Sequence, residues 1–224
     1  MTGAQIFENI RIICGRISHA AIRAGRRPED IKLIAVTKTI NIQQIKEAIG
    51  AGLRIFGESK VQEAREKIQD SRFKIQNSNI EWHLIGHLQK NKAKTAVELF
   101  EMIHSVDSLE LAEATDKYAE KAGKIQKILL QVKLSDEISK YGILKDNLFE
   151  LAREIREMKN LRIEGLMTIP PFFENPENAR PYFSELRTLR DKAEMMGFNL
   201  PELSMGMTND FEVAIEEGAT MVRI

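Results

Sequence analysis

Apolar residues recur along this chain with two different periods. Ile6, Ile10, Ile13 and Ile17 are spaced by four, three and four residues, which is the period of one face of an α-helix. The segment that follows, 31–38 (IKLIAVTK), is short, apolar and rich in branched residues, and this is typical of a buried strand. The pattern therefore predicts a helix followed by a buried strand at the start of the chain.

The same alternation continues to residue 224. Seven further short apolar segments predict strands, at 54–58, 82–88, 102–106, 127–134, 162–169, 202–207 and 220–224. Seven segments with helical period lie between the strands, at 42–49, 61–70, 91–99, 109–121, 144–158, 179–196 and 210–217. Residues 77–79 and 173–177 have the composition of loops.

Eight strands that alternate with helices predict parallel strands joined by right-handed crossovers. We therefore expect an α/β fold, a single (β/α)8 barrel of the TIM type that forms one domain over residues 1–224. No helix follows the eighth strand, so the extra N-terminal helix is expected to fill the vacant place in the outer ring. An open, doubly wound sheet is the alternative.

Composition narrows the class of protein. The 224 residues include 33 Lys and Arg and 33 Asp and Glu, so the formal net charge is zero and gives no global attraction to nucleic acid or to an anionic membrane. Hydrophobic residues make up 43%, and no apolar run approaches the length of about 20 residues that a membrane span requires. The lone Cys14 excludes an internal disulfide and is expected in the core. A soluble cytoplasmic protein fits these features.

A barrel of this kind carries its chemistry where the strands end. Lys38 ends the first strand, where partial burial favours the neutral amine that can form a Schiff base, although a lysine that extends to water is the alternative. The segment from Ser204 through Gly206 to Thr208 offers hydroxyls and open backbone for an anion, with Thr208 and Asn209 as caps of the next helix; an ordinary capped turn is the alternative.

Three further features complete the candidates. Arg223, on the last strand, is expected beside the first strand after barrel closure, where its charge would favour the neutral Lys38 amine; an arginine paired with a surface carboxylate is the alternative. His83 and His87 could share a face, but they lack the partners of a metal site, so no metal is predicted. The cluster of Lys90, Lys92 and Lys94 favours a solvated helix start over a nucleic-acid surface.

Taken together, six ordered motifs resemble the pyridoxal-phosphate-binding homeostasis proteins, the alanine-racemase-N-terminal-like barrels. The resemblance spans nearly the whole chain. Its carriers are IAVTKT (34–39), FGESKVQE (56–63), WHLIGHLQKNK (82–92), GLM (165–167), LSMGMT (203–208) and GATMVRI (218–224). The family usually has Asn where Ser59 stands, and its members continue past the final Val-Arg-Ile with a glycine-containing tail.

The resemblance implies a bound cofactor, pyridoxal 5′-phosphate (PLP). It implies that Lys38 holds PLP as a Schiff base, that Ser204 and Thr208 with the nearby backbone contact the phosphate, and that Arg223 lies near the pyridine nitrogen or the phosphate. The predicted cofactor-binding residues are Lys38, Ser59, His83, Ser204, Gly206, Thr208 and Arg223, and no catalytic residue is assigned.

A role in binding is favoured over catalysis. An arginine near the pyridine nitrogen weakens the ring as an electron sink, and racemisation needs acid and base groups on opposite faces of the substrate. Tyr118, Tyr141 and Tyr182 are the available phenols, and none is predicted at a strand end. We therefore expect a monomer or weak dimer that holds PLP in vitamin B6 homeostasis, affects amino-acid balance and delivers PLP to apoenzymes.

Three alternatives stay open from the sequence. The first is a PLP-dependent amino-acid racemase or a related PLP enzyme. The second is a barrel enzyme in which Lys38 forms a Schiff base with a phosphorylated sugar. The third is an interaction protein that uses the barrel only as a scaffold.

Overall fold

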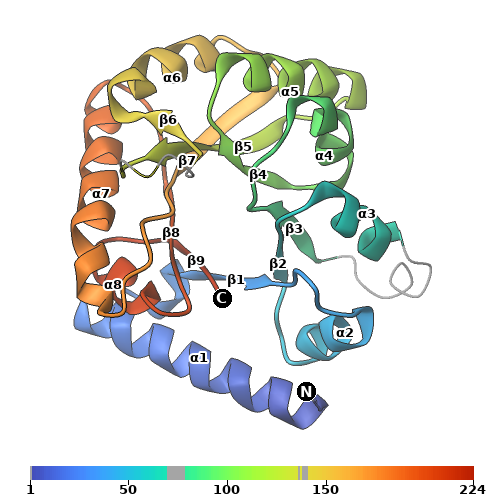
Figure 1. Ribbon diagram of the computed structural model, residues 1–224, viewed down its shortest axis with the longest axis vertical. Helices are drawn as coiled ribbons and strands as arrows, with labels where there is room; N and C mark the ends of the chain where they lie inside the picture. The colour runs from blue at the N-terminus through green and yellow to red at the C-terminus, as the bar shows by residue number, and fades with distance from the viewer. Residues whose placement is uncertain (1, 70–78, 136, 138–140) are drawn as a thin grey trace.

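A closed barrel of parallel strands forms the centre of the protein (Figure 1). The computed structural model describes residues 2–69, 79–135, 137 and 141–224. Within these residues the strands are β1 (Lys32–Val36), β2 (Ile55–Glu58), β3 (Glu81–Leu84), β4 (Met102–Val106), β5 (Gln126–Lys133), β6 (Ile143–Leu144), β7 (Leu161–Met167), β8 (Glu202–Met207) and β9 (Met221–Arg223).

Strand pairing closes the sheet on itself. β1 pairs in parallel with β2 and also with β9, so that Leu33 lies beside Val222 and Ala35 beside Phe56. β4 pairs with β5, and β5 pairs with β7, which completes a ring of eight strands without β6. The predicted (β/α)8 barrel is confirmed, and the open doubly wound sheet is wrong because each of the eight strands pairs with two neighbours, so that the ring has no edge.

Helices surround the barrel as the crossovers between strands require (Figure 1). The α-helices are α1 (Gly3–Arg23), α2 (Ile42–Gly50), α3 (Val61–Gln69), α4 (Ala93–Leu99), α5 (Leu109–Ala122), α6 (Leu148–Arg156), α7 (Arg180–Met195) and α8 (Phe211–Glu216). Short 3-10 turns, η1 to η4, cover Pro28–Asp30, Lys90–Lys92, Lys145–Asn147 and Pro176–Ala179. No helix in the described part of the chain is long and apolar enough to cross a membrane.

The leading helix takes the predicted place in the outer ring, beside α8 and α2 (Figure 1). Its apolar stripe faces inward, since Ile6 and Ile17 are buried. Arg16 on α1 forms a two-pronged ion pair with Glu212 on α8, with a closest N–O distance of 2.9 Å. Cys14 is exposed, so its predicted place in the core is wrong: it lies off the stripe that Ile10 and Ile13 continue.

Alternation along each strand divides the core into two parts. The larger part lies between the sheet and the helices. The smaller fills the barrel and consists of Ile34, Ile85, Met102, Leu129, Met167 and Met221, with Val36, Ile55 and Ile169 partly buried against them. On β1, therefore, Ile34 and Val36 point into the barrel, and a residue at position 38 continues that register.

Two predicted elements differ in detail. The helix predicted over 144–158 begins at Leu148, because Gly142 with φ 131° places Ile143 beside Val132 as the short strand β6. The strand predicted over 82–88 ends at Leu84, and the chain then leaves the sheet. The predicted loop at 173–177 runs into η4, whereas Asp70 and most of the predicted loop at 77–79 fall outside the described residues.

Candidate functional site

The carboxyl end of β1 presents a lysine. Lys38 follows β1 in the inward register of Ile34 and Val36, and its side chain is exposed. Its ammonium has no hydrogen-bond or ion-pair partner among the described residues. The structure thus leaves a primary amine available at the mouth of the barrel, where a carbonyl compound can reach it.

The turn that carries Lys38 is held from its outer side. Thr39 has φ 64°, a left-handed conformation that β-branched residues rarely adopt. Its amide donates to Glu63 Oε1 at 2.5 Å, and Lys67 Nζ donates to the carbonyl of Thr37 at 2.5 Å. Both backbone neighbours of Lys38 are therefore fixed by side chains of α3, which restricts the direction in which the lysine leaves the turn.

A buried ion pair anchors this arrangement. Glu58, at the end of β2, is fully buried, and its Oε1 accepts from Lys67 Nζ at 2.7 Å and from the Thr37 hydroxyl at 2.7 Å. Lys67 also contacts Glu63 Oε1 at 2.7 Å, one turn earlier on α3. We name Glu58, Glu63 and Lys67 the α3 clamp. Its function in the fold is to join the end of β1, the end of β2 and α3.

Arg223 lies inside the barrel. It is 3% exposed, and it donates from NH1 to Ser204 Oγ at 2.7 Å and from NH2 to the Thr168 carbonyl at 3.0 Å. Burial lowers the pKa of Arg223 to about 10, and the charge of Asp210 opposes this shift. The alternative in which Arg223 pairs with a surface carboxylate is wrong. Its register places it beside Ile34, so it starts deeper in the barrel than Lys38.

A chain of buried polar groups continues from Ser204. His104 Nδ1 lies 3.0 Å from Ser204 Oγ, and His104 Nε2 lies 3.0 Å from His83 Nδ1. His83 Nε2 in turn lies 3.3 Å from Glu81 Oε2. Burial holds the pKa of His104 well below its usual value of 6.5, and the neighbouring His83 and Arg223 add to the shift. The hydrogen bond from His83 lowers the pKa of Glu81.

His104 is the residue that the sequence analysis missed. It alternates with Met102, which points into the barrel, so it shares the inward face of β4. The sequence did contain a signal for it. His104 lies on the inward face of a fully buried strand, and another histidine, His83, lies on the adjacent strand.

The turn after β8 differs from its prediction. Gly206 has φ 90°, and a Cβ on it would lie 2.6 Å from the Cβ of Ala214, so only glycine lets the chain turn so close to α8. The predicted caps Thr208 and Asn209 are wrong, because Asp210 holds the N-cap position and its carboxylate accepts from the Met207 amide at 2.6 Å. Thr208 is exposed at this turn.

Other predicted residues lie around the same end of the barrel. Ser59, half-buried, follows β2, and its carbonyl packs so closely on Gly86 that a Cβ there would lie 2.2 Å away. His87 does not share a face with His83: its ring stacks on Tyr141, with centroids 3.8 Å apart. The Tyr141 carbonyl accepts a hydrogen bond from Gln131, near the end of β5, at 3.0 Å. Tyr141 therefore lies near a strand end, contrary to the prediction.

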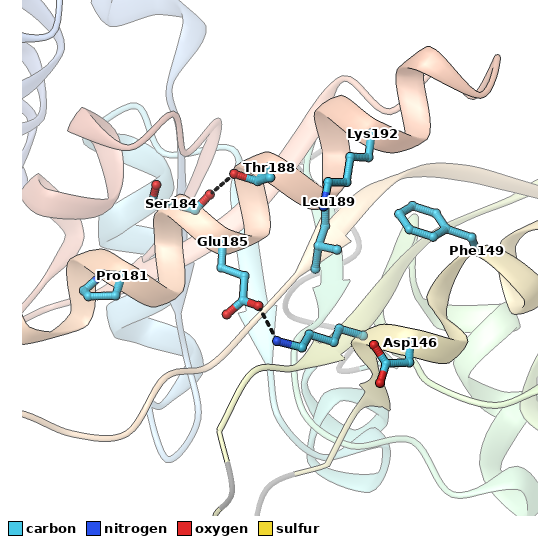
Figure 2. Close-up of a pocket in the computed structure, with 9 residues that line it drawn as sticks. Asp146, Phe149, Pro181, Ser184, Glu185, Thr188, Leu189 and Lys192 are labelled. Carbon is cyan, nitrogen blue, oxygen red and sulfur yellow. Dashed lines mark hydrogen bonds and ion pairs between the residues drawn. The ribbon is translucent and has the colours of Figure 1, made fainter.

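Two features of the described residues bear on other kinds of site. No group of three or more His, Cys, Asp or Glu side chains there is arranged to hold a metal ion. A cavity of 690 Å³ lies in the outer layer between η3, α6 and α7. Figure 2 shows its lining, in which Lys145 pairs with Glu185 at 2.9 Å. None of the predicted site residues lines this cavity.

The barrel and its strand-end lysine define an α/β barrel of the alanine racemase N-terminal class, and residues 14–224 match the family model described as alanine racemase, N-terminal domain. The chain is 43% identical over 218 residues to the pyridoxal phosphate homeostasis protein of Aquifex aeolicus, covering 97% of this chain and 94% of that protein. It is 38% identical over 221 residues to the protein of the same name from Vibrio alginolyticus, covering 99% and 95%.

A solved structure agrees with these relatives. PipY of Synechococcus elongatus PCC7942, determined with PLP bound, superimposes with a TM-score of 0.82 at 37% identity, covering 94% of this chain and 96% of that one. The chain therefore belongs to the pyridoxal phosphate homeostasis protein family.

Proposed function

We propose that this protein binds pyridoxal 5′-phosphate at the carboxyl end of its barrel and acts in intracellular PLP homeostasis. The observation that carries the proposal is the placement of Lys38, an exposed amine in the inward register of β1 with a clamped backbone on both sides. The relatives named for PLP homeostasis and the PLP-bound PipY structure support the same ligand.

The residues present fit this group. PLP supplies an aldehyde and an anionic phosphate when it is bound. The Lys38 amine would attack the aldehyde carbon, form a C=N bond and release water, so the bond is reversible by hydrolysis. Arg223 supplies a positive charge, and Gly206 stays a predicted member of the binding set. Ser59, His83, Ser204 and Thr208 stay predicted members of the binding set.

The proposed role is to hold and release PLP rather than to transform a substrate. A carrier needs a reversible covalent bond and a grip on the anion, and the single barrel domain of residues 1–224 offers groups for both. We propose that the protein works in the cytoplasm as a monomer or weak dimer, delivers PLP to apoenzymes and so affects amino-acid balance.

The test is a labelling experiment on the purified protein. PLP is added, the visible spectrum is recorded, the complex is reduced with borohydride and the pyridoxyl group is located by peptide mapping. We expect the label on Lys38 and its loss in Lys38→Ala, whereas Lys60→Ala, an exposed lysine at the neighbouring strand end, keeps it. A protein that stays colourless with added PLP, or a label elsewhere, overturns the proposal.

The binding role is tested separately from PLP binding itself. Candidate L-amino acids are incubated with the PLP-loaded protein, and the enantiomers are separated by chiral chromatography. Racemisation at a rate typical of enzymes, on the order of 1–10³ per second, would overturn the binding role and leave the PLP site intact.

A further inference from the structure

We propose that His104 is a positioning residue for Arg223: together with His83 it forms a hydrogen-bonded relay that fixes the Ser204 hydroxyl, and the hydroxyl fixes the guanidinium. The relay runs through the inside of the barrel from Glu81 to Arg223, with links of 3.3, 3.0, 3.0 and 2.7 Å. The hydrogen-bonded relay does not depend on the proposed function. Only the identity of the ligand that Arg223 would contact, PLP, rests on it.

The Glu81 carboxylate at one end of the relay determines which group donates and which accepts in every hydrogen bond. An ionised carboxylate only accepts, so His83 donates to it from Nε2 and, when neutral, accepts at Nδ1. His104 then donates from Nε2 to His83 and accepts at Nδ1. Ser204 must donate its proton to His104, and its lone pairs are left to accept from Arg223. In this one arrangement every neutral group in the relay both donates and accepts, and both histidines carry their proton on Nε2.

Burial enforces this arrangement. His83 is 1% exposed, and His104 and Ser204 are 0% exposed, so water cannot replace a lost partner. His104 also lies close to the positive Arg223, and burial keeps the pKa of His104 well below 6.5, so the ring stays neutral. A neutral His104 is the form that can accept from Ser204 while it donates to His83.

The relay restricts how Arg223 can turn. NH1 is held by Ser204 and NH2 by the Thr168 carbonyl, which fixes the plane of the guanidinium from two sides. Two of its five N–H groups are used in this way, and a bound ligand would offer an acceptor to the others. Ser204 would therefore act on a bound ligand through Arg223. A pre-oriented donor binds more tightly because less side-chain freedom is lost on binding.

The first test needs no ligand. The chain has four histidines, so ¹⁵N NMR of the ring nitrogens can resolve each one, with His19→Gln and His87→Gln for assignment. At about pH 7 we expect a neutral His104 ring that carries its proton on Nε2, and we expect Nδ1 of His83 to accept the hydrogen bond from that N–H. A proton on Nδ1 of His104, or titration of His104 near that pH, overturns the relay.

The second test measures PLP binding by absorbance and fluorescence titration. His104→Phe fills the space but cannot accept or donate, and we expect PLP to bind about tenfold more weakly with a shifted absorbance maximum. His104→Gln offers an amide oxygen to Ser204 and an amide N–H to His83, and we expect it to stay within about threefold of the original protein. His19→Gln, far from the relay on the exposed face of α1, is the matched control.

A double variant keeps the test decisive if His104→Phe folds poorly. Ser204→Ala breaks the same relay with a smaller side chain, and Ser204→Ala with His104→Gln should bind PLP no worse than Ser204→Ala alone. Unchanged binding in both His104→Phe and Ser204→Ala overturns the inference. If the original protein fails to bind PLP, the proposed function fails, and the NMR result still decides the relay.

Discussion

Lys38 and Arg223 lie on neighbouring strands, yet the protein holds the two cations in opposite ways. Lys38 is exposed, and its position is set through the backbone of Thr37 and Thr39 by the α3 clamp outside the barrel. Arg223 is buried, and its position is set through its own side chain by Ser204 and Thr168 inside the barrel. The difference suits the chemistry: an amine that forms and breaks a bond needs access, whereas a charge that only attracts a ligand needs a fixed orientation.

The clamp should give the largest effect on stability. Lys67→Met leaves the fully buried Glu58 carboxylate without its cation, and we expect the free energy of unfolding to fall by about 3 kcal/mol. Lys94→Met removes an exposed partner of Glu98, whose pair is 4.0 Å apart, and should cost less than about 0.5 kcal/mol. Urea denaturation of both variants is the measurement, and equal losses would show that the α3 clamp is no stronger than a surface pair.

The turn after β8 should give the next largest effect. Gly206→Ala combines a positive φ with a contact of 2.6 Å to Ala214, and we expect a loss of about 2 kcal/mol. Gly197→Ala has a similar φ of 85° but no atom within 4 Å, and should lose only about 1 kcal/mol. Thermal and urea unfolding compare the two, and a Gly197 variant as unstable as the Gly206 variant would show that the close approach to α8 contributes nothing.

The buried His104 should make the free energy of unfolding depend on pH. His104 has a folded-state pKa well below its usual 6.5, so below that pH the unfolded chain binds a proton that the folded protein does not. Stability is therefore present above pH 6.5 and is lost as the pH falls, by up to about 1.4 kcal/mol per pH unit. His104→Gln lacks the titratable imidazole and therefore lacks this contribution to the pH dependence.

The measurement compares unfolding free energies of the original protein and His104→Gln between about pH 5 and about pH 7, a window above the usual pKa values of Asp and Glu. The difference between the two proteins should change by up to about 2 kcal/mol across that window, because all other groups are shared. Parallel curves would show that His104 takes up a proton as readily in the folded protein as in the unfolded chain.

The two regions also differ in how far the sequence predicted them. Strand-end position alone selects Lys38, because the period of the apolar residues fixes both the strand and the end at which it stops. The α3 clamp and the relay were not predicted. Glu58 and Lys67 are nine residues apart in the chain and meet only because α3 folds back on β2, and His104 and Ser204 are brought together from opposite parts of the barrel.

Side-chain partners account for the other differences. The inward register of Arg223 follows from alternation with Met221, but whether it meets a carboxylate, a hydroxyl or a carbonyl depends on β7 and β8, which no local pattern specifies. Likewise, Asp210 rather than Thr208 stands at the N-cap position of α8, and its carboxylate accepts from the Met207 amide. Local periodicity thus predicts how deeply a side chain is buried and which way it points. Tertiary contacts decide which hydrogen-bond partners it has.

Lys38 should give the smallest effect on stability. Its side chain is exposed and has no polar partner among the described residues, and the clamp acts on the backbone of Thr37 and Thr39. We expect Lys38→Ala to change the free energy of unfolding by less than about 0.5 kcal/mol, measured by urea denaturation without ligand. Added PLP should raise the Tm of the original protein, since a ligand that binds only the folded state stabilises it, and should raise the Tm of the variant far less. A large loss of stability without ligand would mean that Lys38 supports the fold, and its strand-end position would then no longer argue for a binding role.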